Sequence, residues 1–65
     1  MKNFLFFTTK ENGTKVIKPI SAPDYVTAIQ DYYKHNRMFA WKIVEGHIDQ
    51  VKKEVVGKVL FEEVK

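Results

Sequence analysis

The first twenty residues alternate between apolar and polar stretches in a way that is typical of two strands. Lys2–Thr9 is rich in Phe and Thr, and Lys15–Ile20 is rich in Val and Ile, with Glu11-Asn12-Gly13-Thr14 between them. Aromatic and β-branched residues favour strands, and Asn-Gly favours a tight turn because both residues accept the positive φ of a type I′ turn. The pattern therefore predicts a β-hairpin.

A two-residue Asn-Gly turn also fixes the register of this hairpin. It places Glu11 opposite Thr14 and, further along, Leu5 opposite Ile20. One predicted face then carries Leu5, Phe7, Thr9, Val16 and Ile20, and the other carries Phe4, Phe6, Thr8, Ile17 and Pro19. Both faces are apolar, whereas a hairpin with one solvated face usually alternates between apolar and polar residues. Pro19 lacks an N–H, which indicates an edge strand.

The next segment, from Ser21 to Asn36, has the apolar spacing of a helix. Ser21 and Asp24 have the spacing of a capping box, and Asn36 is a candidate left-handed stop. At about 100° per residue, the predicted core stripe comprises Ala22, Val26, Ile29 and Tyr33, flanked by Tyr25, Tyr32 and Asn36. We expect this helix to lie with one side on the sheet.

The last part of the chain predicts further strands. Met38–Glu45 alternates as a third strand, which Gly46 ends or bulges. Residues 47–57 have helical apolar spacing, with Asp49 as a possible cap, but their valines favour a strand or extended hairpin. Lys58–Val64 predicts the last strand. The fold class is therefore α+β in the order ββαββ, a mostly antiparallel sheet of three or four strands with one helix on one face.

Length and composition narrow the class of protein. A chain of 65 residues predicts one small domain, residues 1–65. A core of this size buries only about 60% of the surface that the unfolded chain exposes, so the chain is too short to divide into two cores. The chain contains no cysteine, so it has neither disulfides nor thiolate metal ligands. The apolar run Phe4–Phe7 is too short for a signal-peptide core or a membrane span. We expect a cytoplasmic protein.

Residues able to carry out catalysis are scarce. The single serine, Ser21, is already assigned to a helix cap, and His35 and His47 flank the predicted third strand on opposite sides. No phosphate-binding glycine loop, dinucleotide fingerprint or H-E-x-x-H motif is present. We therefore expect no enzyme and no catalytic, cofactor or metal site.

The apolar second face of the hairpin is the main functional signal. One helix covers one face of a sheet, so Phe4, Phe6 and Ile17 would form an exposed apolar patch, which is typical of a partner-binding site. Replacing Phe6 with Lys would then remove partner binding and leave the protein folded. Two other outcomes stay open: the last third of the chain completes the core over this face, or a second copy covers it as a structural homodimer.

Basic residues support an alternative function. The net charge is +3, and Arg37 is the single arginine among eleven basic residues, which argues against bidentate base reading. A lysine-rich surface with flanking tyrosines would still suit nucleic acid. Its candidate residues are Lys34, Arg37, Lys52, Lys53, Tyr25 and Tyr32.

The order of an apolar strand, an Asn-Gly turn, a second strand, a capped helix and further strands is similar to that of many short accessory proteins of bacteria and their phages. This likeness is one of pattern and transfers no functional residue. The sequence favours a small protein-binding module, such as an inhibitor or regulatory accessory protein, with nucleic-acid binding as the alternative.

Overall fold

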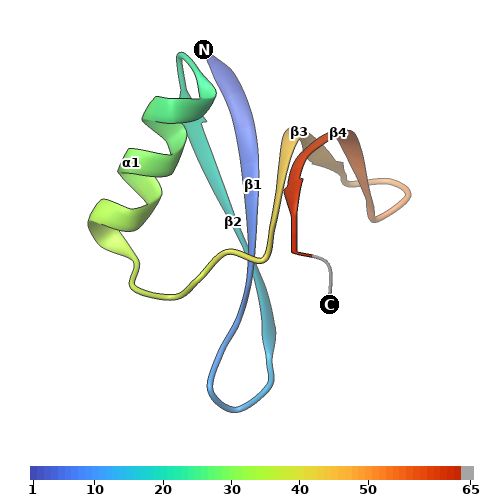
Figure 1. The fold of residues 1–65 in the computed structure, drawn as a ribbon. Helices are drawn as coiled ribbons and strands as arrows, with labels where there is room; N and C mark the ends of the chain where they lie inside the picture. The colour runs from blue at the N-terminus through green and yellow to red at the C-terminus, as the bar shows by residue number, and fades with distance from the viewer. Residues whose placement is uncertain (64–65) are drawn as a thin grey trace.

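The computed structural model describes residues 1–63 as one antiparallel sheet with a helix across one of its faces (Figure 1). The elements are β1 (Lys2–Thr9), β2 (Lys15–Ala22), α1 (Tyr25–His35), β3 (Lys42–Asp49) and β4 (Glu54–Glu62). The four strands lie in the order β2-β1-β3-β4. The predicted α+β class and ββαββ order are therefore confirmed. Val64, the predicted end of the last strand, lies outside the described residues.

The β1–β2 hairpin differs from the prediction in its turn. The Lys10 N–H donates to the Thr14 carbonyl at 2.8 Å, and the Gly13 N–H donates to the Lys10 carbonyl at 2.9 Å. Asn12 accepts the Thr14 N–H through its side chain at 2.9 Å, and Gly13 has a φ of +87°. The loop therefore has three residues, because the Asn12 side chain forms an Asx turn and only Gly13 adopts positive φ.

This longer turn moves the register by one residue, so the predicted register is wrong. Phe4 pairs with Ile20 and Phe6 with Lys18. A slip of one residue transfers every β2 side chain to the other face. Ile17 consequently lies on the face opposite to Phe4 and Phe6, and the predicted patch of these three residues does not exist.

Phe4 and Phe6 are instead core residues. Both are fully buried beneath α1. The Phe6 ring stacks on Tyr32 with centroids 4.5 Å apart and planes 7° apart. Tyr32 is itself fully buried, and its hydroxyl donates to the Met38 carbonyl at 3.0 Å. This stack joins the sheet, the helix and the segment that follows the helix.

The helix begins later than predicted. Ser21 lies in β2, where its hydroxyl donates to the Asn3 side chain at 2.9 Å. Asp24 is the N-cap, and its carboxylate accepts the Thr27 N–H at 2.8 Å. The predicted capping box is therefore wrong. Aspartate and serine are equally good N-caps, and Ser21 is not free to cap the helix because Ser21 and Ala22 pair with β1.

The end of the helix and its buried face also differ from the prediction. Asn36 is extended rather than left-handed, with a φ of −133°, and its side chain donates to the Tyr32 carbonyl at 2.8 Å. The core side comprises Tyr25, Ala28, Ile29 and Tyr32, which have i, i+3, i+4, i+7 spacing. Val26 is 63% exposed. The predicted stripe was displaced because it was anchored on Ala22, which belongs to β2.

The last third forms the extended hairpin that the sequence favoured over a helix. The predicted bounds of the third strand, Met38–Glu45, are wrong, because β3 begins at Lys42 and continues through Gly46 to Asp49. β3 and β4 pair from Lys42–Glu62 to Asp49–Glu54. The Asp49 carboxylate accepts the N–H groups of Val51 and Lys52 at 2.9 and 3.1 Å, so it caps the turn. Lys53 adopts a φ of +59° there.

The cap at Asp24 is expected to make the stability of the protein depend on pH. The hydrogen bonds from Thr27 hold the pKa of Asp24 below its ordinary value of 3.8. The carboxylate therefore stabilises the fold at neutral pH, and this contribution disappears as the pH falls through the lowered pKa. We expect Asp24→Ala to lower the melting temperature at neutral pH and to have a smaller effect well below pH 3.8.

Thermal unfolding followed by circular dichroism checks this prediction. Asp24→Asn is the matched control, because it keeps an oxygen that can accept from Thr27 but removes the charge. It is expected to lose less stability than Asp24→Ala at neutral pH. Equal losses for Asp24→Ala at neutral and acidic pH would contradict the assigned role.

Candidate protein-binding face

The sheet face opposite α1, here called the open face, carries apolar side chains from all four strands. Directly paired residues share a face, so the register identifies the members of this face. They are Leu5, Phe7, Ile17, Pro19, Val44, Ile48, Val55 and Val59. Within residues 1–63 no helix lies on this face, because α1 lies on the other side (Figure 1).

Exposure increases from the centre of the open face to its margins. Leu5 and Val44, which pair with each other across β1 and β3, are only 3% and 2% exposed. Val55 and Val59 on β4 are 40% and 47% exposed, and Pro19 on β2 is also exposed. The open face therefore has a closely packed apolar floor with exposed apolar residues on both sides of it.

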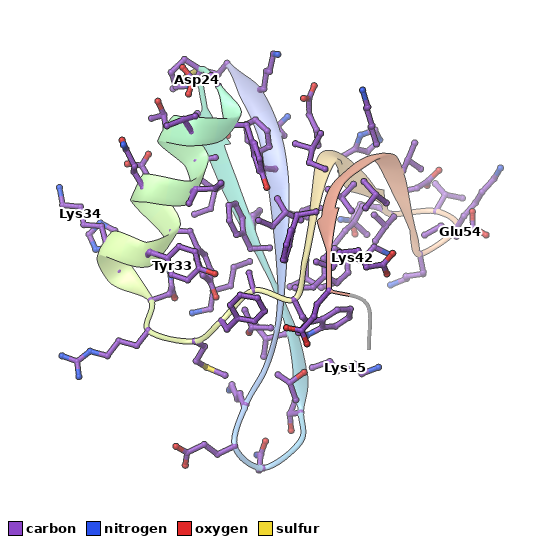
Figure 2. The ribbon with its side chains drawn as sticks, viewed as in Figure 1. Lys15, Asp24, Tyr33, Lys34, Lys42 and Glu54 are labelled. Atoms are coloured by element: carbon purple, nitrogen blue, oxygen red, sulfur yellow. The ribbon has the colours of Figure 1, made fainter. Side chains whose placement is uncertain are left out.

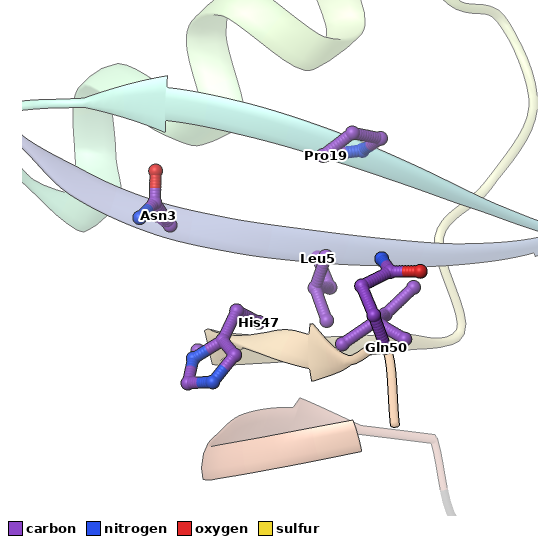
Figure 3. Close-up of a pocket in the computed structure, with 7 residues that line it drawn as sticks. Asn3, Leu5, Pro19, His47 and Gln50 are labelled. Atoms are coloured by element: carbon purple, nitrogen blue, oxygen red, sulfur yellow. The ribbon is translucent and has the colours of Figure 1, made fainter. Parts of the chain in front are cut away.

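A groove of about 260 Å³ lies at one end of the open face (Figure 3). Pairing between β1 and β3 runs from Phe7–Lys42 to Phe4–Glu45, and beyond Glu45 β3 pairs only with β4. The strands separate there and leave the groove between them. Its lining residues are Asn3, Leu5, Pro19, Gly46, His47, Ile48 and Gln50. The lining thus combines apolar side chains with the polar side chains of Asn3, His47 and Gln50.

Two facing glycines shape the hairpin beside this groove. Gly46 and Gly57 are paired across β3 and β4. A Cβ atom on Gly46 would lie 2.0 Å from the Val56 carbonyl oxygen and 2.7 Å from the Gly57 Cα. No side chain fits at this position, so the glycine pair allows the two backbones to approach closely.

Aromatic rings and lysines occupy the other end of the open face. The rings of Phe7 and Trp41 lie 5.7 Å apart. The Lys15 ammonium lies 5.7 Å from the centre of the Trp41 ring, and that of Lys42 lies 5.4 Å from the centre of Phe7. Cations at these distances are attracted to the ring faces. This end therefore combines apolar area with positive charge.

Trp41 is held in place by polar contacts as well. Its indole N–H donates to the Thr9 hydroxyl at 3.1 Å, and its backbone N–H donates to the Phe7 carbonyl at 3.0 Å. The ring is half-buried and contributes to a second hollow of about 510 Å³, lined by Thr9, Lys15, Phe39, Trp41 and Glu63. Trp41 thus lies at the margin of the sheet, between this hollow and Phe7.

The residues predicted for nucleic-acid binding do not form one surface. Tyr32 is fully buried, and burial raises its pKa. Lys34 lies near the end of α1, whereas Lys52 and Lys53 lie in the β3–β4 turn, next to Glu54. Figure 2 places Lys34 and Glu54 on opposite sides of the molecule. The structure therefore brings Tyr25, Tyr32, Lys34 and Arg37 to α1 and the residues just after it, and it does not bring Lys52 and Lys53 to them.

The described residues contain no cluster of three side chains suited to hold a metal ion. His35 and His47 are exposed and belong to different elements. Among residues 1–63, α1 is too short and too polar to cross a membrane.

Comparison with protein-family models, with curated proteins and with solved structures found no match for this chain.

Proposed function

We propose that this protein is a small non-enzymatic binding module that docks an apolar surface of another protein onto its open face. The main support is that apolar side chains from four strands form a strip across one face of the sheet, and no helix of residues 1–63 lies over it. The strip is closely packed at its centre, and its margin is exposed at Val55 and Val59. Contiguous exposed apolar surface is typical of a partner site. The closely packed floor at Leu5 and Val44 supports a rigid surface that needs little rearrangement on binding.

The charges around the strip suggest the chemistry of the partner. Lys15 and Lys42 flank the aromatic end of the open face. The Lys42 Nζ atom also lies 3.9 Å from the Glu62 Oε2 atom. A partner with an apolar centre and acidic residues beside it would complement this arrangement, since interfaces combine an apolar core with a charged rim. An inhibitor or regulatory accessory protein of the cytoplasm would suit such a surface.

Nucleic-acid binding has less support as the function, because Tyr32 is buried. Lys52 and Lys53 lie beside Glu54, on the opposite side of the molecule from Lys34. Salt separates the two functions in solution. Binding to phosphates weakens steeply as salt rises, whereas docking of apolar surfaces depends little on salt. We expect partner binding through the open face to persist in high salt.

Substitutions on the open face test the proposal. Ile17→Lys and Val59→Lys place charge on a half-buried and an exposed side chain of the strip. Both variants are expected to remain folded and to lose at least about tenfold in partner affinity, because a lysine in the centre of an apolar interface must be desolvated. Val26→Lys makes the same chemical change on the exposed side of α1 and is the matched control.

The measurement is affinity capture from a lysate of the source organism with wild type and the three variants, followed by mass spectrometry and titration of the captured protein. The proposal predicts a protein that binds wild type and Val26→Lys equally and binds the two open-face variants weakly. Equal capture by all four proteins would contradict it. Capture of nucleic acid that disappears in high salt would favour the alternative function.

A further inference from the structure

We infer that a second copy of this chain pairs with the free edge of β4 in antiparallel orientation, with Val56 opposite Val56 at the two-fold axis. This self-association uses the backbone edge of β4, whereas the proposed partner site is a face of the sheet, and the inference does not depend on that site.

β4 is an unprotected edge strand. It has nine residues, pairs on one side with β3, and is exposed at every position except Leu60. Its exposed residues include Val55, Val56, Val59 and Phe61. The edge at β2 differs, because Pro19 interrupts it and α1 packs against that strand. Long exposed strands with β-branched residues readily accept another strand.

The backbone of β4 offers hydrogen-bonding groups to a partner strand near Val56. The Val56 carbonyl oxygen is directed toward Gly46 in β3, since it lies 2.0 Å from the place of a Gly46 Cβ. N–H and C=O groups of successive strand residues point to alternate sides. The groups of Val55 and Gly57 therefore point to the free edge. With Val56 at the axis, Val55 of each copy lies opposite Gly57 of the other.

Charge complementarity selects this register. In the β3–β4 hairpin, Glu54 lies opposite Asp49, which has the same charge, and Lys58 lies opposite Glu45. Because Asp49 and Glu45 are four residues apart in β3, the side chains of Glu54 and Lys58 lie on the same face of the sheet. Within residues 1–63 neither forms an ion pair. With Val56 at the axis, Glu54 of each copy lies opposite Lys58 of the other, and two favourable pairs form.

The neighbouring registers are less favourable. Placing Lys58 at the axis would bring two lysines of the same face together, which is repulsive, and would leave Glu54 without an opposite charge. Placing Leu60 at the axis would match Lys58 with Glu62. However, the register shift between Ile43 and Val44 leaves Leu60 without a partner in β3, so Lys58 and Glu62 lie on opposite faces.

The dimer would join two sheets into one. Val55 and Val59 belong to the open face and lie along the joined edge, so the open faces of both copies would continue across the axis. Two partner sites would then lie on one rigid surface, which raises the avidity for a partner with two copies of its own site.

Charge reversal tests the register. Glu54→Lys and Lys58→Glu each convert both predicted ion pairs into repulsive pairs, and each is expected to weaken dimerisation by roughly tenfold or more. The double variant with both changes restores opposite charges and is expected to dimerise like wild type. Sedimentation velocity over a dilution series measures the dimerisation constant of each protein.

The same charge changes in the β1–β2 turn are the controls. Lys10 and Glu11 are exposed and lie outside β4. The variants Glu11→Lys and Lys10→Glu are therefore expected to leave the dimerisation constant unchanged. Circular dichroism confirms that each variant is folded. Three results would overturn the inference: a wild-type protein that stays monomeric at the highest soluble concentration, single variants that dimerise as tightly as wild type, or a double variant that is no stronger than the single ones.

A single cysteine gives a direct test, because the chain contains none. Facing residues at the axis of an antiparallel pair have Cα atoms about 4.5–5.5 Å apart, which suits a disulfide. Val56→Cys is expected to form a covalent dimer on mild oxidation, whereas Val26→Cys on α1 is expected to stay largely monomeric. Equal cross-linking at both positions would overturn the inference.

Discussion

Replacing Phe6 with Lys is expected to unfold the protein. Phe6 is fully buried and stacks on Tyr32 with centroids 4.5 Å apart. Removing a buried Phe side chain alone costs about 3–5 kcal/mol, and an ammonium group without a partner in this apolar site costs more. A core of this size provides only about 3–5 kcal/mol in total. The variant should therefore lack the cooperative unfolding transition of the wild type.

Circular dichroism and a proton–nitrogen correlation spectrum measure this outcome. Val26→Lys is the matched control, because Val26 is 63% exposed on the opposite side of α1, and it should give a dispersed spectrum and a normal transition. The pattern of the sequence alone predicted that Phe6→Lys would remain folded. A folded Phe6→Lys protein with a dispersed spectrum would contradict the core that we describe.

Gly46→Ala is the second substitution expected to have a large effect. The added Cβ would lie 2.0 Å from the Val56 carbonyl oxygen, which is backbone and cannot turn away like a flexible side chain. The β3–β4 hairpin must open, and hydrogen bonds between its strands are lost. We expect the free energy of unfolding to fall by at least about 4 kcal/mol. This loss is as large as the whole stability that a core of this size provides.

Gly13→Ala is the control for this substitution. No atom lies within 4 Å of a Cβ at Gly13, but the residue has a φ of +87°. Its expected cost is about 1–2 kcal/mol, from the backbone conformation alone. Chemical denaturation of the two variants and the wild type compares these values. If Gly46→Ala were no less stable than Gly13→Ala, the close approach of β3 and β4 would be incorrect.

The type and order of the elements could be predicted from the sequence because local signals agree with one another. Aromatic and β-branched residues mark β1, β2 and β4, and the Asn12-Gly13 dipeptide marks the first turn. The last hairpin could be favoured over a helix through its valines. These signals depend on the preferences of neighbouring residues, which do not require knowledge of the tertiary structure.

The faces of the sheet could not be predicted from the same signals. Asn-Gly occurs in two-residue loops and in longer ones, and here the Asn12 side chain accepts the Thr14 N–H within a three-residue loop. The length of this loop sets the register and hence which side of β2 meets the helix. The expectation of an apolar second face was useful, but Leu5, Val44 and Val59 form it and Phe4 and Phe6 do not.

The first residue of α1 could not be predicted from local preferences either. Ser21 and Asp24 are both good caps, so local preference does not distinguish them. Pairing of Ser21 and Ala22 with β1 decides the matter in favour of Asp24. Because the buried side of α1 depends on where it begins, the sequence also misplaced Val26 and Tyr33 in the core.

Site-specific photo-cross-linking shows whether another protein docks on the open face. A photoreactive amino acid is introduced in separate proteins at Ile17, at Val59 and at Val26, and each is irradiated in cells of the source organism. We expect a covalent adduct with the same protein from positions 17 and 59 and none from position 26. Adducts from position 26 alone, or no adduct from positions 17 and 59, would contradict the proposed function.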